Sequence, residues 1–175
     1  MNKKYIITGA PGTGKTSIIN HLNQKGYHCV DENSRTLITN QLAINGDILP
    51  WKNQIAFENI ISMKRAKDYI NSPKDAVCFF DRSIIDCIAY LKINKKEPTK
   101  LIRDLMKNYQ FNKDIFYTPF WSEIYTNDKE RKESIENAIY IEKIILETYK
   151  YYGYNPILVP KLSIKKRIDF ILSKI

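Results

Sequence analysis

Apolar runs and helical stretches alternate along this chain. Between the runs, apolar residues recur at the three- and four-residue spacing of helices. Five short β-prone runs predict buried strands at residues 5–8, 27–30, 76–80, 115–118 and 157–159. Seven helices are predicted, at 15–24, 32–44, 51–71, 83–93, 98–108, 135–152 and after the cap residue Ser163. Such alternation predicts an α/β fold: a five-stranded parallel sheet with helices on both faces.

A glycine-rich loop joins the first predicted strand to the first predicted helix. Its sequence, Gly9-Ala10-Pro11-Gly12-Thr13-Gly14-Lys15-Thr16, matches the phosphate-loop pattern G-x-x-x-x-G-K-[ST]. Glycines let successive backbone N–H groups turn toward a phosphate, and the helix N-terminus adds partial positive charge. We expect a nucleoside triphosphate, ATP or GTP, to be bound by Gly9, Gly12, Thr13, Gly14, Lys15, Thr16 and Ser17. Lys15 would act catalytically on the β- and γ-phosphates, and the Thr16 hydroxyl would bind Mg²⁺.

A second group of polar residues follows the buried run at 76–80. Asp81 ends that predicted strand, where its carboxylate would lie beside the phosphate loop and bind Mg²⁺. Arg82 would clamp phosphate oxygens during catalysis, and Asp86, one helical turn further on, would orient it and border the substrate. A plain N-terminal cap remains the other interpretation of Asp81.

An acid also follows the second predicted strand. Glu32 faces the substrate side of the expected cleft, where it could accept a proton from an attacking hydroxyl. Arg35 is three residues further on, so it could bind the acceptor or keep Glu32 charged. An ordinary ion pair in the first turn of a helix is the alternative.

A polar segment at about 122–134 predicts a lid, and Arg131 within it is a candidate catalytic arginine. An ordinary solvated helix is the alternative for this segment. On the third predicted helix, Trp51, Gln54 and Phe57 could line the acceptor pocket by stacking on a ring and reading its edge. Simple core packing of the two aromatic residues is the competing explanation.

These motifs together resemble the P-loop kinase superfamily. Within it, the chain is similar to a short AAA-domain family that resembles the nicotinamide riboside kinase domain of NadR, and more distantly to nucleoside and thymidylate kinases. The similarity rests on 31–35, on Gly46-Asp47-Ile48-Leu49-Pro50-Trp51, on 81–90 and on 152–160. It implies a three-layer P-loop fold and nucleotide binding over a single domain, 1–175.

Charge and composition narrow the partners. The net charge of +9 suits anionic ligands, but the basic residues are spread along the chain, so we expect no dedicated nucleic-acid binding. Three scattered cysteines fit a reducing cytoplasm, and neither a signal peptide nor a transmembrane segment is expected. The two histidines have no ligand-like neighbours. A homodimer is compatible with this pattern.

The sequence therefore predicts a cytoplasmic small-molecule kinase. It would transfer the γ-phosphoryl group of Mg–ATP to a hydroxyl or phosphate of a nucleoside-like or nucleotide-like acceptor. Two alternatives remain open: a nucleotide-controlled ATPase or GTPase module that binds a lipid or protein partner, and a nucleic-acid-binding ATPase.

Overall fold

The strands form one parallel sheet in the order β2-β3-β1-β4-β5. The computed structural model describes residues 2–124 and 134–175. Within them the strands are β1 (Lys4–Thr8), β2 (His28–Val30), β3 (Cys78–Asp81), β4 (Asp114–Tyr117) and β5 (Asn155–Leu158). Because every pairing is parallel, all the carboxyl ends of the strands lie at one edge of the sheet. The predicted α/β sheet is confirmed.

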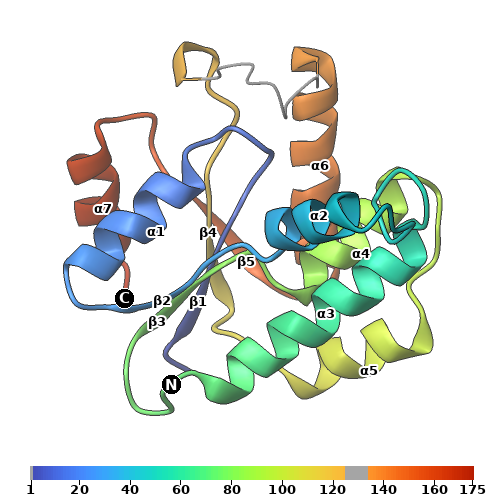
Figure 1. Ribbon diagram of the computed structural model, residues 1–175. Coiled ribbons are helices and arrows are strands. Elements are labelled where there is room, and N and C mark those ends of the chain that lie inside the picture. The colour runs from blue at the N-terminus through green and yellow to red at the C-terminus, as the bar shows by residue number, and fades with distance from the viewer. Residues whose placement is uncertain (1, 125–133) are drawn as a thin grey trace.

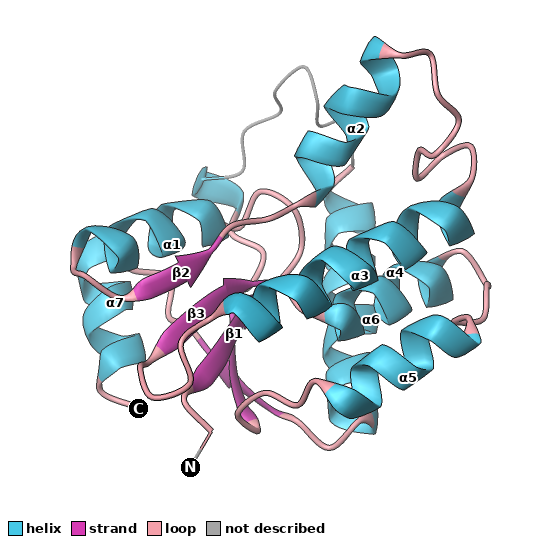
Figure 2. Ribbon diagram, turned by 60° about the horizontal axis from the view of Figure 1, so that its bottom comes forward, coloured by secondary structure: helices cyan, strands magenta, loops and turns pink. Residues whose placement is uncertain are grey.

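Helices cover both faces of this sheet (Figure 1). They are α1 (Lys15–Gln24), α2 (Ser34–Ala43), α3 (Gln54–Asn71), α4 (Ile84–Ile93), α5 (Lys100–Asn108), α6 (Ile135–Tyr151) and α7 (Ile164–Leu172), with a short 3₁₀ turn at Ser122–Ile124. Figure 1 shows α1 and α7 on one side and α3 to α6 on the other, while α2 extends away from the body in Figure 2.

Two hydrophobic clusters hold the three layers together, because alternate residues of each strand point to opposite faces. Ile7 of β1 packs with Ile18 of α1 and Ile168 of α7 on one face. Ile6 faces the other way and packs with residues of α4 and α6, including Ile145. The central strands are therefore buried from both sides and give the functional edge a rigid support.

The start of α3 differs from the predicted position. Asn53 caps the helix by accepting a hydrogen bond from the backbone N–H of Ala56, so α3 begins at Gln54 rather than at Trp51. Trp51 consequently lies in the preceding turn and is 65% exposed.

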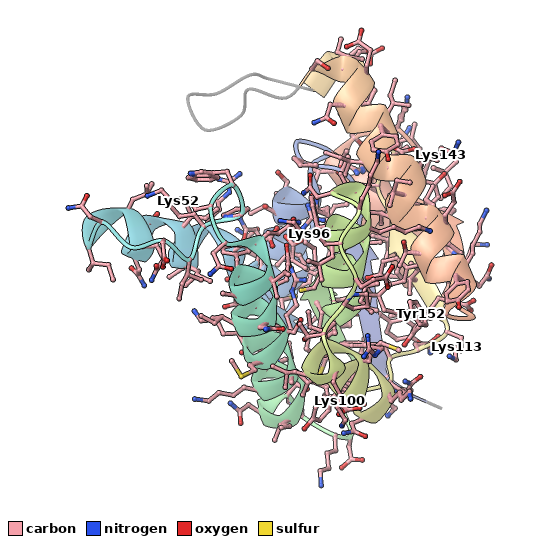
Figure 3. All side chains as sticks on the ribbon, turned by 90° about the vertical axis from the view of Figure 1, so that its right-hand side faces the viewer. Lys52, Lys96, Lys100, Lys113, Lys143 and Tyr152 are labelled. Carbon is pink, nitrogen blue, oxygen red and sulfur yellow. The ribbon has the colours of Figure 1, made fainter. Side chains whose placement is uncertain are left out.

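Positive charge is distributed over several elements. The labelled lysines in Figure 3 come from the turn before α3, the loop after α4, α5, the residue before β4, and α6: Lys52, Lys96, Lys100, Lys113 and Lys143. In the described part of the chain, none of the helices has both the length and the apolar character that crossing a bilayer requires.

Candidate functional site

The phosphate loop connects β1 to α1 and takes its shape from its glycines. Gly9, Gly12 and Gly14 have φ angles of 144°, 78° and 83°, which strain any residue with a Cβ. At Gly9, a Cβ would also lie 2.4 Å from the carbonyl oxygen of Thr118, so the residue that follows β4 approaches the loop closely. The loop ends at the N-terminus of α1, an arrangement that binds anions.

Lys15 points back over this loop. Its Nζ donates hydrogen bonds to the carbonyl oxygens of Gly9, at 3.1 Å, and Ala10, at 2.7 Å. Burial lowers the pKa of Lys15 to about 8, helped by the positive charge of Arg82 and opposed by Asp81 and Glu32. The ammonium group is therefore held among charges of both signs, at the place where phosphates would add negative charge.

Thr13 stabilises the loop from behind. Its hydroxyl lies 3.0 Å from the Ala10 carbonyl and 2.6 Å from the Thr118 hydroxyl, and its own carbonyl accepts a hydrogen bond from Arg167 of α7. Neither Gly9 nor Thr13 lines the cleft, whereas Gly12, Gly14, Lys15, Thr16 and Ser17 do. The Thr13 side chain therefore supports the loop, while the nucleotide binding predicted for Gly9 and Thr13 stays a prediction.

Asp81 is the last residue of β3 and pairs in register with Ile7 of β1. It is 5% exposed, and its Oδ1 has no hydrogen-bond partner among the described residues. Burial raises the pKa of Asp81 to about 6, although Lys15 opposes this effect. An unpartnered carboxylate oxygen of this kind suits a hard cation.

Glu32 and Arg82 form the centre of the site. Arg82 Nε donates to Glu32 Oε2 at 2.7 Å, and its Nη1 donates to Asp86 Oδ1 at 3.2 Å. Arg65 of α3 approaches the other oxygen of Glu32 at 3.1 Å. Burial raises the pKa of Glu32, but Arg82, Arg65 and Lys15 outweigh it and hold the pKa at about 2. Glu32 is thus a carboxylate at neutral pH.

A large cleft of about 1420 Å³ is bordered by Glu32, Arg65, Asp81 and Arg82. Its lining comes from the phosphate loop, from the segments that follow β2 and β3, and from α2 and α3. Pockets for one drug-sized ligand span roughly 300 to 1,000 Å³, so this cleft has room for a triphosphate and a second molecule.

A comparison with protein-family models gives one match, to a family described as an AAA domain, over residues 4–167. The chain belongs to this AAA-domain family. No curated protein sequence matches it.

Three solved structures of similar fold are two kinases and NadR. A deoxyadenosine kinase from M. mycoides is 18% identical, with a TM-score of 0.67 over 98% of this chain and 97% of that one. NadR in complex with NR is 15% identical, with a TM-score of 0.70 over 98% of this chain and 50% of that chain, so the AAA-domain protein spans about half of NadR. Thymidylate kinase from Ehrlichia chaffeensis is 13% identical, with a TM-score of 0.63 over 98% and 96%. The predicted three-layer P-loop fold is confirmed.

Several predicted substrate residues of this AAA-domain protein are placed differently from expectation. Gln54 does not line the cleft, because its amide donates to the Tyr90 carbonyl and accepts from Asn94. Asp86 is fully buried behind Arg82, so it orients that arginine rather than bordering substrate. Arg35, Trp51 and Phe57 do line the cleft, together with Glu32 and Arg82. Phe57 also packs in the core, in agreement with the competing explanation.

Arg65, from the middle of α3, was not predicted as a site residue from the sequence. Its Nη1 also donates to the Ser83 carbonyl at 2.6 Å, so it joins α3 to the start of α4. The available signal was a charged residue on the same helical stripe as Phe57 and Ile61, where only a partner makes burial tolerable. Arg131 and most of the predicted lid lie outside the described residues.

Proposed function

We propose that this AAA-domain protein is a kinase that transfers the γ-phosphoryl group of Mg–ATP to a small acceptor of nucleoside or nucleotide type. The observation that carries the proposal is a partly buried carboxylate, Glu32, held between Arg65 and Arg82 in the same cleft as a phosphate loop. A loop alone serves any nucleotide-binding protein. The carboxylate adds a group that can orient an attacking hydroxyl.

The similar structures support an acceptor of this class. One is a deoxyadenosine kinase bound to dCMP and dCDP, one is NadR bound to NR, and one is a thymidylate kinase. All three share the fold of this chain, and the phosphate loop and the acid after β2 lie in the same cleft here. We therefore expect a nucleoside or nucleotide beside Glu32, in the space that the phosphate loop leaves.

Mg²⁺ fits the residues on the donor side. Thr16 lines the cleft with a hydroxyl, and Asp81 offers the unpartnered Oδ1. Mg²⁺ commonly takes one or two carboxylates and completes its shell with phosphate oxygens and water. This agrees with the finding that no cluster of three acidic, histidine or cysteine ligands occurs among the described residues. When bound, Mg²⁺ supplies neutralisation of phosphate charge.

On the acceptor side, Glu32 and Arg82 have complementary roles. The Glu32 carboxylate would accept the hydrogen bond of the acceptor hydroxyl and so aim that oxygen at phosphorus. Its low pKa makes it a weak base, so it takes the proton only once bond formation to phosphorus has made the hydroxyl strongly acidic. Arg82 would stabilise charge on the transferred group, with Arg131 as a further predicted contributor.

Acceptor-dependent turnover tests the proposal. Purified protein is incubated with Mg–ATP and a panel of nucleosides and nucleotides, and ADP formation is followed. We expect at least one acceptor to raise ADP formation well above the rate with ATP alone. A folded sample that binds ATP but gives no acceptor-dependent turnover would contradict the proposal. Acceptor-independent hydrolysis would favour the nucleotide-controlled module.

A further inference from the structure

Glu58 is a buried acid in the cleft that the proposed chemistry does not use. It lies on α3, is 5% exposed and lines the cleft beside Phe57 and Arg65. Among the described residues, no lysine or arginine forms an ion pair with the Glu58 carboxylate, whereas Glu32 and Asp86 both have arginine partners. Its hydrogen-bond partner is the thiol of Cys87, a weak donor. Glu58 therefore retains acceptor capacity that the fold leaves unused.

The other polar side chains of α3 offer a ligand no free acceptor in this cleft. Arg65 Nε and the Ser62 hydroxyl have no hydrogen-bond partner among the described residues, but a guanidinium only donates and Ser62 does not line the cleft. Arg65 is bound to Glu32, to the Ser83 carbonyl and to the Cys87 sulfur. The Gln54 amide is hydrogen-bonded to residues of α4 and its following turn. Glu58 is thus the polar side chain of α3 that lines the cleft with capacity to receive a hydrogen bond from a ligand.

We propose that Glu58 selects the acceptor, favouring a planar ring that presents an N–H₂ group and rejecting the analogue that presents oxygen at the same position. This inference rests on the proposed kinase function and specifies its acceptor. A carboxylate can only accept hydrogen bonds, so an amino or carboxamide N–H₂ satisfies it. An oxygen placed there would face a second acceptor, and both groups would lose their hydration without compensation.

The cleft that Glu58 lines suits a flat ring. The aromatic side chains of Trp51, Phe57 and Tyr90 line the same cleft, as do the aliphatic Ile38 and Leu42. Aromatic residues provide faces and edges against which a planar ligand packs. One polar group among apolar walls fixes the orientation of a ligand more than it adds to affinity.

Burial raises the pKa of Glu58 to about 7, opposed by Arg65 and by the hydrogen bond of Cys87. Near neutral pH a fraction of the side chain is therefore a neutral carboxylic acid, which could also donate to an oxygen. Measurements at about pH 8 keep the carboxylate form predominant and give the discrimination its full size.

Three matched pairs of ligands test the inference without knowledge of the natural acceptor. Each pair replaces N–H₂ with oxygen: on the ring in cytidine against uridine and adenosine against inosine, and on the ring substituent in nicotinamide riboside against nicotinic acid riboside. The third pair also adds a negative charge. Binding is measured by calorimetry at about pH 8 with wild type, and turnover is measured with Mg–ATP. For each pair that binds, we expect the N–H₂ member to bind about 10- to 100-fold more tightly.

Glu58→Gln is the variant that isolates the carboxylate. A glutamine amide offers both an acceptor and a donor, so it can pair with either member, and the ratio should fall to within about threefold. Glu147→Gln, on the exposed side of α6, serves as the control and should keep the wild-type ratio. Equal affinity of wild type within the pairs it binds, or an unchanged ratio in Glu58→Gln, would overturn the inference alone. Binding of none of the six ligands by protein that binds ATP would overturn the proposed nucleoside acceptor together with it.

Discussion

Lys15 shows how the protonation of a single side chain depends on the charges that surround it. Its lowered pKa reflects burial and the nearby Arg82, only partly offset by Asp81 and Glu32. A triphosphate would add several negative charges within reach of the ammonium group and restore a high pKa. Between the two values, binding of the ligand must be accompanied by uptake of a proton.

At about pH 8.5, ATP binding should therefore take up a fraction of a proton per site. Calorimetry in two buffers with different ionisation enthalpies measures it as a difference in apparent binding enthalpy. Lys15→Ala should nearly abolish ATP binding while its circular dichroism spectrum stays native, and Lys52→Ala, in the turn before α3, should behave like wild type. Buffer-independent enthalpies in wild type would argue against this setting for Lys15.

The negative charge of Glu32 should matter for phosphoryl transfer and not for ATP binding. Glu32→Gln keeps the shape of the side chain but removes the charge that we propose to orient an attacking hydroxyl, so kcat should fall about 10²- to 10⁴-fold. ATP affinity should change little, because the phosphate loop is intact. Rapid-mixing or steady-state ADP assays measure the first quantity, and calorimetry measures the second. Transfer as fast as in wild type would reduce Glu32 to a structural partner of Arg65 and Arg82.

At the scale of elements, Asp86 joins three parts of the fold. Its Oδ1 accepts hydrogen bonds from the Thr8 hydroxyl of β1, at 2.6 Å, and from Arg82. Its Oδ2 accepts from the Ser83 backbone N–H, at 2.8 Å, and from the Tyr149 hydroxyl of α6, at 2.5 Å. The arginine of the site is thus positioned by an acid that α6 itself helps to hold.

Tyr149→Phe should destabilise the fold by about 1 to 3 kcal/mol, because it removes a hydrogen bond to a buried carboxylate. Urea denaturation monitored by circular dichroism measures the change. Tyr151→Phe is the matched control. Tyr151 is 82% exposed, so removal of its hydroxyl group should leave stability within about 0.5 kcal/mol of wild type. A Tyr149→Phe protein as stable as wild type would show that the hydrogen bond from Tyr149 of α6 to Asp86 of α4 does not contribute to stability.

Features that arise within one stretch of chain could be predicted from the sequence, whereas contacts between distant elements could not. The phosphate loop and the alternation of strands and helices are local patterns, so both were predictable. The Glu32 cluster was only half predictable: the acid and Arg82 follow strand ends, whereas Arg65 comes from a helix interior 33 residues away from Glu32. The Asn53 cap sets the start of α3 at Gln54, later than the apolar pattern predicts. The Gln54 amide donates to a backbone carbonyl of α4, a contact that no local pattern indicates.

At the scale of the whole molecule, two buried carboxyl groups in the cleft make the stability of the fold depend on pH. The carboxyl groups of Asp81 and Glu58 have pKa values of about 6 and about 7 in the fold, both raised by burial. The unfolded chain ionises them near pH 4, so between these values the folded protein binds more protons. Stability therefore falls as the pH rises from about 4 to about 7 on account of these two groups.

Asp81→Asn should remove the part of this pH-dependent loss of stability that comes from Asp81. Relative to wild type, the variant should be more stable by about 1 to 3 kcal/mol at about pH 8 and nearly equal at about pH 4. It should also bind ATP with a much weaker dependence on Mg²⁺. Urea denaturation at the two pH values and calorimetry with and without Mg²⁺ measure these effects. A variant that is less stable at pH 8 and still responds fully to Mg²⁺ would contradict both assignments of Asp81.

Arg82 has a φ angle of 75°, a left-handed conformation that costs a residue with a side chain roughly 1 to 3 kcal/mol. Glycine would adopt the same turn freely, yet it has no guanidinium group to reach Glu32 and Asp86. Removing one partner of a buried ion pair costs about 3 to 5 kcal/mol, more than the strain that glycine would relieve. A selection for thermal robustness alone should therefore keep arginine at position 82, as should a selection for growth that depends on the proposed reaction. The codon for Arg82 should therefore persist under both regimes despite its strained backbone.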